Sequence, residues 1–333
     1  MVGKLKLFFI VFTLGFCSIL SFGQDVHFST FNANPMFLNP ANTAFGSSLF
    51  RVGTMYRNQW STVSSGYNSY LLTAEVLPYS SRVRRHGIGL GVNFLADVAG
   101  TLRYGQQNIG LSLSYFKGID ANRDHYISFG LQANTTGWGY NLANSVFGRN
   151  PEDAEGIFLH NIRTFDFGLG AHWQLKANEK HNLQAGLSFL HINQPNLSYY
   201  ESEDILLPIK INAYFSDLIT ISYNYSLSPS IFFQKQDKFL EFVIGGDYNI
   251  NLSETVSSSK ILSFGAYYRV IDAMIVMAKY NYNNFHFGIS YDLNLSRLTP
   301  ASKTYGGVEI WLLYSFNPVS YKKSRTSIPC PAF

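Results

Sequence analysis

Long segments in which apolar and polar residues alternate one by one constrain the fold of this chain more than any other feature. In FHFGISYDLNLS, residues 285–296, every odd position is apolar and every even position is polar or glycine. Residues 164–175 and 87–94 show the same split. A period of two places the apolar side chains on one face of a strand and the others on the opposite face. These segments predict strands with one face suited to lipid and one suited to water.

A soluble β-sandwich would show the same period, so composition and strand length must distinguish it from a membrane barrel. Aromatic residues make up 16% of the chain and charged residues only 14%, well below the quarter that is usual in soluble proteins. No stretch after residue 23 reaches the roughly 18 to 20 uninterrupted apolar residues of a spanning helix. A closed barrel is the remaining structure that pairs every backbone group within hydrocarbon. We therefore expect an all-β fold, a transmembrane antiparallel β-barrel.

The pattern predicts about 14 strands, to within two. Most have nine or more residues, the length that a tilted strand needs to cross a bilayer. An even count returns both termini to the periplasmic side of a Gram-negative outer membrane, and the longest links, residues 139–161 and 193–207, then face outward. The expected strands are residues 49–60, 67–77, 86–97, 103–117, 125–138, 162–175, 180–192, 208–224, 229–236, 238–250, 260–270, 273–281, 284–295 and 304–316.

The first 23 residues predict a cleaved secretory signal peptide. Lys4 and Lys6 precede an apolar run, and the small residues Ser21 and Gly23 come just before Gln24. The expected division is a signal peptide at 1–23, a plug or collar at 24–48, the barrel at 49–316 and a periplasmic tail at 317–333. The chain has two cysteines, of which Cys17 leaves with the signal, so the mature chain is predicted to form no internal disulfide.

The stretch FNANPMFLNP, residues 31–40, interrupts this pattern with two Asn-Pro pairs. Each proline removes a backbone donor and disfavours helical geometry in the preceding asparagine, so the stretch cannot add a regular strand to the barrel. Its apolar side chains nevertheless favour burial. Because the expected strands already complete the barrel wall, we expect this stretch to form a folded plug or collar in the lumen or its periplasmic mouth. The asparagines would cap turns there.

Charged residues at inward-facing positions are the expected surroundings of that segment. Buried charges need partners or water, so these side chains either form lumenal salt bridges that prop the barrel or provide a polar surface that receives a peptide or plug. The inward charges are Glu75, Asp97, Asp166, Glu241, Asp247, Arg269, Asp292, Glu309, Arg51 and Arg57. The candidate plug and lumen contacts are Asn34, Pro35, Asn39, Pro40, Arg57, Arg269 and Asp292.

Several classes of function find no support in the sequence. The histidines show no ligand-like spacing, the mature chain keeps a single cysteine, and no Gly-rich phosphate loop or nucleophile signature occurs. The mature formal charge of about +2 is too small to indicate nucleic-acid binding. We expect a protein that is not an enzyme, has no cofactor or metal, and lies in outer-membrane lipid.

The C-terminal tail follows the last expected strand, so barrel assembly does not require it. We expect it to project into the periplasm, either as a disordered end or as a docking peptide for a periplasmic partner. The candidate docking residues are Lys322, Lys323, Arg325, Cys330 and Phe333.

Six or more blocks spread along the chain carry a family resemblance. The stretch QDVHFSTFNANPMFLNPANTAF with RVGTMYRNQW, and later HINQPN, LSPSIFF, FGAYYR, GISYDLNLSRL, GGVEIWLLYSF and the terminal CPAF, occur in the order that the family shows. The chain resembles the PorP/SprF family, outer-membrane proteins of the type IX secretion and gliding machinery of Bacteroidota.

This resemblance implies a function that the alternation alone does not supply. Family members are expected to help export or anchor secreted surface adhesins through a C-terminal sorting domain, or to link other type IX secretion components in the periplasm to the outer membrane. No catalytic residues carry over. The alternative is a general porin or a hydrophobic-solute channel, which the polar lumen favours and the lack of a dense basic ladder disfavours.

Overall fold

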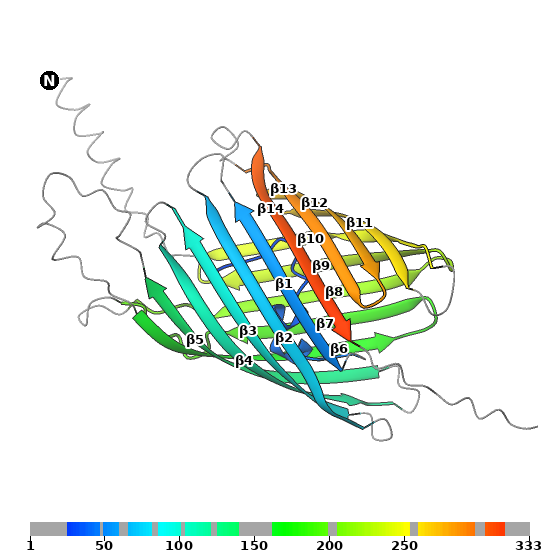
Figure 1. The fold of residues 1–333 in the computed structure, drawn as a ribbon, viewed down its shortest axis with the longest axis horizontal. Helices are drawn as coiled ribbons and strands as arrows, with labels where there is room; N and C mark the ends of the chain where they lie inside the picture. The colour runs from blue at the N-terminus through cyan, green and yellow to red at the C-terminus, as the bar shows by residue number, and fades with distance from the viewer. Residues whose placement is uncertain are drawn as a thin grey trace, which may run out of the picture.

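A computed structural model describes residues 25–46, 49–59, 66–81, 86–100, 104–120, 125–139, 162–198, 205–253, 259–296 and 304–316. In this part of the chain, 14 antiparallel strands close into one barrel (Figure 1). The predicted fold class and strand count are therefore confirmed. The described helices are all too short or too polar to cross a membrane. The expected signal peptide and C-terminal tail lie outside the described residues.

Each strand pairs with its neighbours in sequence, and β1 pairs with β14 to close the wall. Met55 of β1, for example, lies opposite Leu71 of β2 on one side and Trp311 of β14 on the other. The strands are β1 Phe50–Gln59, β2 Tyr67–Ser81, β3 His86–Ala99, β4 Tyr104–Gly118, β5 His125–Gly139, β6 Ile162–Lys176, β7 His181–Leu190, β8 Lys210–Thr220, β9 Tyr225–Gln236, β10 Phe239–Asn251, β11 Lys260–Arg269, β12 Ala273–Tyr282, β13 Phe285–Asn294 and β14 Tyr305–Phe316.

Three expected strand boundaries were wrong by four residues, and two of them lie beside a proline. The third is the end of β8, which stops at Thr220 and not at residue 224. Strand β2 continues past Pro78 because its register shifts between Val76 and Tyr79, which takes the proline out of the regular ladder. Strand β9 begins four residues before Pro229. The ladder between β8 and β9 is interrupted next to this proline, so the missing N–H of Pro229 costs the sheet little.

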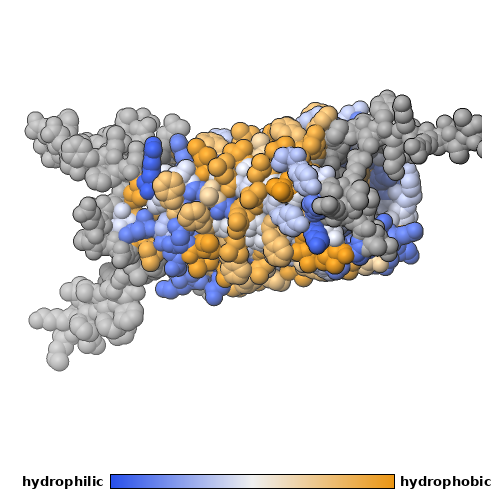
Figure 2. Space-filling model, turned by 90° about the horizontal axis from the view of Figure 1, so that it is seen from below, coloured by the Kyte–Doolittle hydropathy of each residue, from blue (hydrophilic) through white to orange (hydrophobic). Residues whose placement is uncertain are grey.

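The two faces of the wall differ as the alternation predicts. Large apolar side chains such as Leu111, Phe129 and Phe165 point outward and are exposed. Figure 2 shows this apolar surface over the middle of the wall, with polar surface toward both ends. Most inward positions carry polar, charged or glycine residues, and apolar side chains such as Met55, Leu71 and Trp311 fill others. Glu75, Asp166 and Glu309 are each at most 1% exposed. An apolar outer band with a polar interior is the arrangement of an outer-membrane barrel.

Residues 25–46, called the plug segment from here on, lie inside the barrel. The segment contains one turn of helix, α2 Pro35–Leu38, followed by a short 3₁₀ turn, η1 Pro40–Asn42. Each turn begins with an Asn-Pro pair in which the asparagine side chain caps the turn and proline takes the first helical position. Met36, Asn39, Ala41 and Thr43 have no exposed surface.

The plug segment crosses the lumen from one end of the barrel to the other. Asp25 contacts Gln236 and Lys210, which end β9 and begin β8, whereas β14 ends at Phe316 on the opposite side, next to Phe50. We call these the Asp25 end and the Phe316 end. The even strand count had led to the expectation that both termini lie on the periplasmic side. The described ends, Asp25 and Phe316, lie at opposite ends of the barrel instead, because the count fixes where the first strand begins and the last strand ends but not where a segment inside the lumen begins.

Candidate functional site

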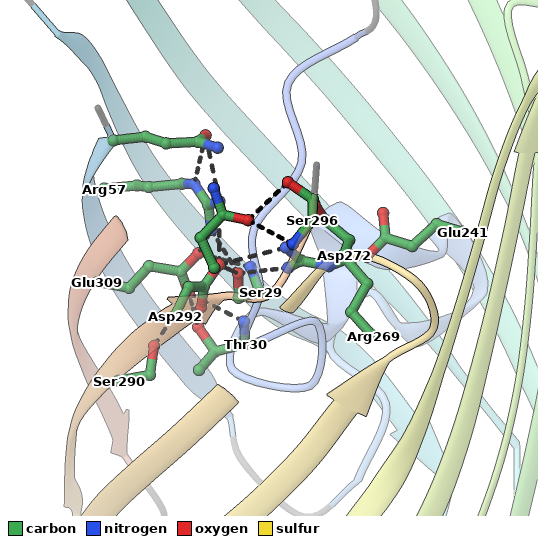
Figure 3. A network of polar contacts seen from close by, with 12 residues as sticks. Ser29, Thr30, Arg57, Glu241, Arg269, Asp272, Ser290, Asp292, Ser296 and Glu309 are labelled. Carbon is green, nitrogen blue, oxygen red and sulfur yellow. Dashed lines mark hydrogen bonds and ion pairs between the residues drawn. The ribbon is translucent and has the colours of Figure 1, made fainter. Parts of the chain in front are cut away.

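A buried polar network fastens the plug segment near the Asp25 end (Figure 3). Arg57 of β1 and Arg269 of β11 each donate a hydrogen bond of 2.5 Å to the hydroxyl of Ser29. Ser29 in turn donates to Asp292 of β13, also at 2.5 Å. All four side chains are at least nine-tenths buried. One serine of the plug segment therefore ties together three strands of the wall.

Glu309 of β14 binds the backbone of the plug segment directly. Its carboxylate accepts hydrogen bonds from the backbone N–H groups of Ser29, at 2.5 Å, and Thr30, at 2.9 Å. It also accepts from the Thr30 hydroxyl at 2.5 Å and forms an ion pair with Arg57. Because Glu309 is fully buried, these charge-assisted bonds form away from water, where they are strong.

Carboxyl groups outnumber guanidinium groups in this network. Arg269 pairs with Glu241 at 3.0 Å and with Asp272 at 3.1 Å, and both arginines pair with Asp292. Together with Glu309, four carboxyl groups share two arginines. Two buried oxygens, Asp292 Oδ1 and Glu241 Oε2, receive no hydrogen bond within the described part of the chain.

A second polar cluster holds the first described residue of the plug segment. The carboxylate of Asp25 accepts from Lys210 Nζ at 3.2 Å and from Gln106 at 3.4 Å, and it pairs with His191 Nε2 at 3.2 Å. His191 follows β7 with a φ of 59°, and its Nδ1 lies 2.7 Å from Asp166 of β6. This imidazole therefore connects the plug segment to the wall.

Electrostatics keep this cluster charged. Burial alone would lower the pKa of His191, but its hydrogen bonds to Asp166 and Asp25 and their negative charges raise that pKa to about 9. Burial would likewise raise the pKa of Asp25, yet Lys210 and His191 hold it far below its usual range. Asp25 and His191 therefore form an ion pair at neutral pH.

Deeper in the lumen, the two Asn-Pro turns fit against glycines of the wall. Asn39 donates to the carbonyls of Ala171, at 2.9 Å, and Leu187, at 3.3 Å, on two neighbouring strands. A Cβ atom at Gly170 would overlap the Asn39 side chain, and one at Gly130 would overlap the backbone at Pro40. The wall lacks side chains where the plug segment comes closest.

Further contacts join the plug segment to the wall around these two turns. Asn34 donates to Thr73 at 2.8 Å, and the hydroxyls of Ser114 and Ser128 donate to plug carbonyls at 2.6 Å. The N–H of Ala44 donates to Glu75 at 2.6 Å. Aromatic packing adds to these bonds: Phe31 stacks on Phe232.

The structure separates the predicted site residues into two groups. Arg57, Arg269 and Asp292 meet around Ser29, whereas Asn34, Pro35, Asn39 and Pro40 lie further along the lumen in the two turns. The tail residues Lys322, Lys323, Arg325, Cys330 and Phe333 lie outside the described residues.

Sequence reasoning missed several contacts of the plug segment. Ser29, Thr30 and Asp25 precede the proline-rich stretch and carry no motif of their own, and His191 was assigned only to a strand end. The inward glycines did leave a signal, since Gly87, Gly89, Gly91, Gly168 and Gly170 fall on the polar side of the alternation. Within the described residues, no group of three or more metal-binding side chains lies close enough to hold a metal ion.

Solved structures share the barrel fold with this chain. The Ralstonia pickettii toluene transporter TbuX is 10% identical with a TM-score of 0.53, over 85% of this chain and 92% of that chain. The CymD monoaromatic hydrocarbon channel is 9% identical with a TM-score of 0.50, over 86% and 93%. Identities this low establish a common fold and nothing more. Among curated proteins, none matches the sequence.

The family comparison is more specific. The model of the type IX secretion system membrane protein PorP/SprF matches residues 20–314, a range that contains the plug segment and almost the whole barrel. The earlier resemblance is therefore confirmed, and the outer-membrane location follows from the family together with the barrel. The chain belongs to the PorP/SprF family of type IX secretion system membrane proteins.

Proposed function

We propose that this protein is a plugged, non-enzymatic barrel that holds secreted surface adhesins at the outer membrane through their C-terminal sorting domain. The observation that carries the proposal is the plug segment itself. It contacts the wall along the lumen and is fastened by Glu309, Arg57 and Arg269. A barrel filled by its own chain suits a docking scaffold of the secretion and gliding machinery better than a conduit.

The proposed orientation places the Phe316 end in the periplasm and the Asp25 end outside. An outer-membrane barrel with an even number of strands begins and ends on the periplasmic side, and β1 begins next to the end of β14. In this orientation the outer mouth faces secreted proteins, and the other end faces further type IX secretion components in the periplasm.

The tail, residues 317–333, is proposed to dock one of those periplasmic components. Its Lys322, Lys323 and Arg325 supply positive charge, and Cys330 and Phe333 close the chain. Truncation after Asn317 is expected to leave barrel insertion intact and to reduce surface display of the adhesin. Normal display after truncation would contradict the docking role.

A general porin or hydrophobic-solute channel is the alternative, and the hydrocarbon channels that share the fold are its support. Deletion of the gene distinguishes the adhesin-holding function from the channel function. If the protein holds adhesins, surface proteomics will lose one or a few large proteins while solute uptake stays unchanged. If solute uptake falls and the surface proteins remain, the channel function replaces the proposal.

The matched control is a strain complemented with the full-length chain. It must recover the lost surface proteins, because recovery excludes an effect of the deletion on neighbouring genes. Co-purification of the complemented protein from native membranes, followed by mass spectrometry, then identifies which secreted protein and which secretion components it binds.

A further inference from the structure

A cavity of about 500 Å³ lies at the Asp25 end of the barrel. Its lining comes from the plug segment and from strands on the β1–β3 and β10–β14 side of the wall, and includes Arg57, Asp97, Arg269 and Asp292. The cavity thus lies directly beside the network around Ser29. In the proposed orientation it opens toward the outside of the cell.

The positive charges that line this cavity are already engaged. Arg57 pairs with Asp292 and Glu309 and donates to Ser29. Arg269 pairs with Glu241, Asp272 and Asp292 and donates to the same serine. Neither guanidinium is free to attract an anion, so the cavity does not resemble a phosphate or carboxylate site.

Two carboxyl groups of the cavity, in contrast, accept fewer hydrogen bonds than their oxygens can take. Asp97 of β3 accepts a hydrogen bond of 2.5 Å from Ser69, and no salt bridge joins it to a cation in the described ranges. Asp292 is 2% exposed, and its Oδ1 receives no hydrogen bond there. A buried carboxylate oxygen without a donor is unfavourable. Two carboxylates on the same wall therefore have acceptor capacity for a cationic ligand.

The kind of cation follows from the donor set. No group of three metal-binding side chains is found among the described residues, which argues against a bound metal ion. Tyr67 and Phe239 line the same cavity, and aromatic rings next to carboxylates favour organic cations. An ammonium group brings three donors and a guanidinium five, so either one can donate to a carboxylate that lines the cavity.

We propose that this outer cavity binds a lysine or arginine side chain of the secreted protein partner. The assignment rests on the proposed function for the identity of the partner, and on Asp97, Asp292 and the cavity for the chemistry. Such a site would give the secreted partner a contact at the outer mouth, at the end of the barrel opposite the proposed position of the C-terminal tail.

The test uses the mature protein in lipid nanodiscs and two fluorescein-labelled pentapeptides, Gly-Lys-Gly-Lys-Gly and Gly-Gln-Gly-Gln-Gly. Fluorescence anisotropy should show at least tenfold tighter binding of the lysine peptide, and added NaCl should weaken that binding because salt screens the charges. Asp97→Asn keeps an acceptor for Ser69 and removes the charge, so it should bring the lysine peptide down to the level of the glutamine peptide.

Asp217→Asn is the matched control, because Asp217 lies on β8 opposite Leu183 and toward the Phe316 end. Binding of the lysine peptide should be unchanged in this variant. Equal affinity for the two peptides, or equal loss in Asp97→Asn and Asp217→Asn, would overturn the assignment. Unfolding midpoints of both variants, measured by circular dichroism, show whether each barrel has remained folded.

The outcomes also distinguish this inference from the proposed function. If the deletion strain keeps its surface proteins while the lysine peptide still binds through Asp97, the adhesin function fails and the cation site stands. If the deletion strain loses them and the peptide does not bind, the function stands and the cation site is wrong.

Discussion

The side chain of Asn39 occupies the space that a side chain at Gly170 would need. This asparagine is fully buried, and it bonds two carbonyls that belong to neighbouring strands. The wall and the plug segment therefore have complementary shapes at this point: a missing Cβ on β6 lets an amide reach the backbone of the sheet. Shape complementarity of this kind makes small changes of volume costly.

The first prediction concerns this fit. Gly170→Ala should destabilise the packed plug by about 1–3 kcal/mol, the usual cost of an extra methyl in a filled core. Chemical unfolding in detergent micelles measures the change. Gly137→Ala is the control, because a Cβ there meets only Gln107 O at 4.0 Å. Equal stability of the two variants would show that the wall does not hold the plug through this contact.

The second prediction concerns hydrogen bonding at the same place. Asn39→Asp keeps the size of the side chain but replaces a donor with an oxygen that faces the carbonyls of Ala171 and Leu187. Loss of the bonds and repulsion between oxygens should release the plug segment, because an unpaired buried polar group costs about 1–3 kcal/mol or more. Planar-bilayer recordings should then show channel openings that the wild type lacks.

Asn281→Asp, the same chemical change on β12, is the control for these recordings and should stay closed. A wild-type protein that conducts ions as freely as Asn39→Asp would contradict the plugged lumen.

The barrel could be predicted from sequence because the alternation that indicates each strand lies within that strand. A period of two over ten or more residues, as in β13, is visible without knowing what the strand touches. The misplaced ends of β2 and β9 fell at Pro78 and Pro229, where a register shift or an interrupted ladder decides whether a strand continues. Such irregularities depend on the neighbouring strand, which the sequence of one strand does not reveal.

The site was less accessible to sequence reasoning because its contacts are distant in the chain. The burial tendency of Phe31 and Met36 and the capping role of the asparagines follow from residue type. The contact between Ser29 and Asp292, which are 263 positions apart in the chain, does not follow from residue type. Alternation predicted that Arg57, Arg269 and Asp292 face inward, but only the closed barrel brings them to one serine.

The third prediction concerns this network. Arg269→Ala leaves Glu241 and Asp292 buried with fewer cationic partners, and breaking a buried pair from one side costs about 3–5 kcal/mol. The midpoint of urea unfolding should fall accordingly. Lys235→Ala, at an exposed position of β9, should change stability by less than about 1 kcal/mol. An equally small effect of Arg269→Ala would mean that the network does not stabilise the barrel.

The last prediction concerns pH and the pairing of Asp25 with His191. The imidazole has a pKa of about 9 in the folded protein and about 6.5 when unfolded. Its stabilising contribution, about 3 kcal/mol, should be complete below pH 6.5 and lost as the pH rises through 9. His191→Asn tolerates the positive φ at this position but cannot be protonated. Thermal unfolding between pH 6 and pH 10 should therefore show a stability gap between wild type and this variant that closes with rising pH, whereas a constant gap would contradict the ion pair.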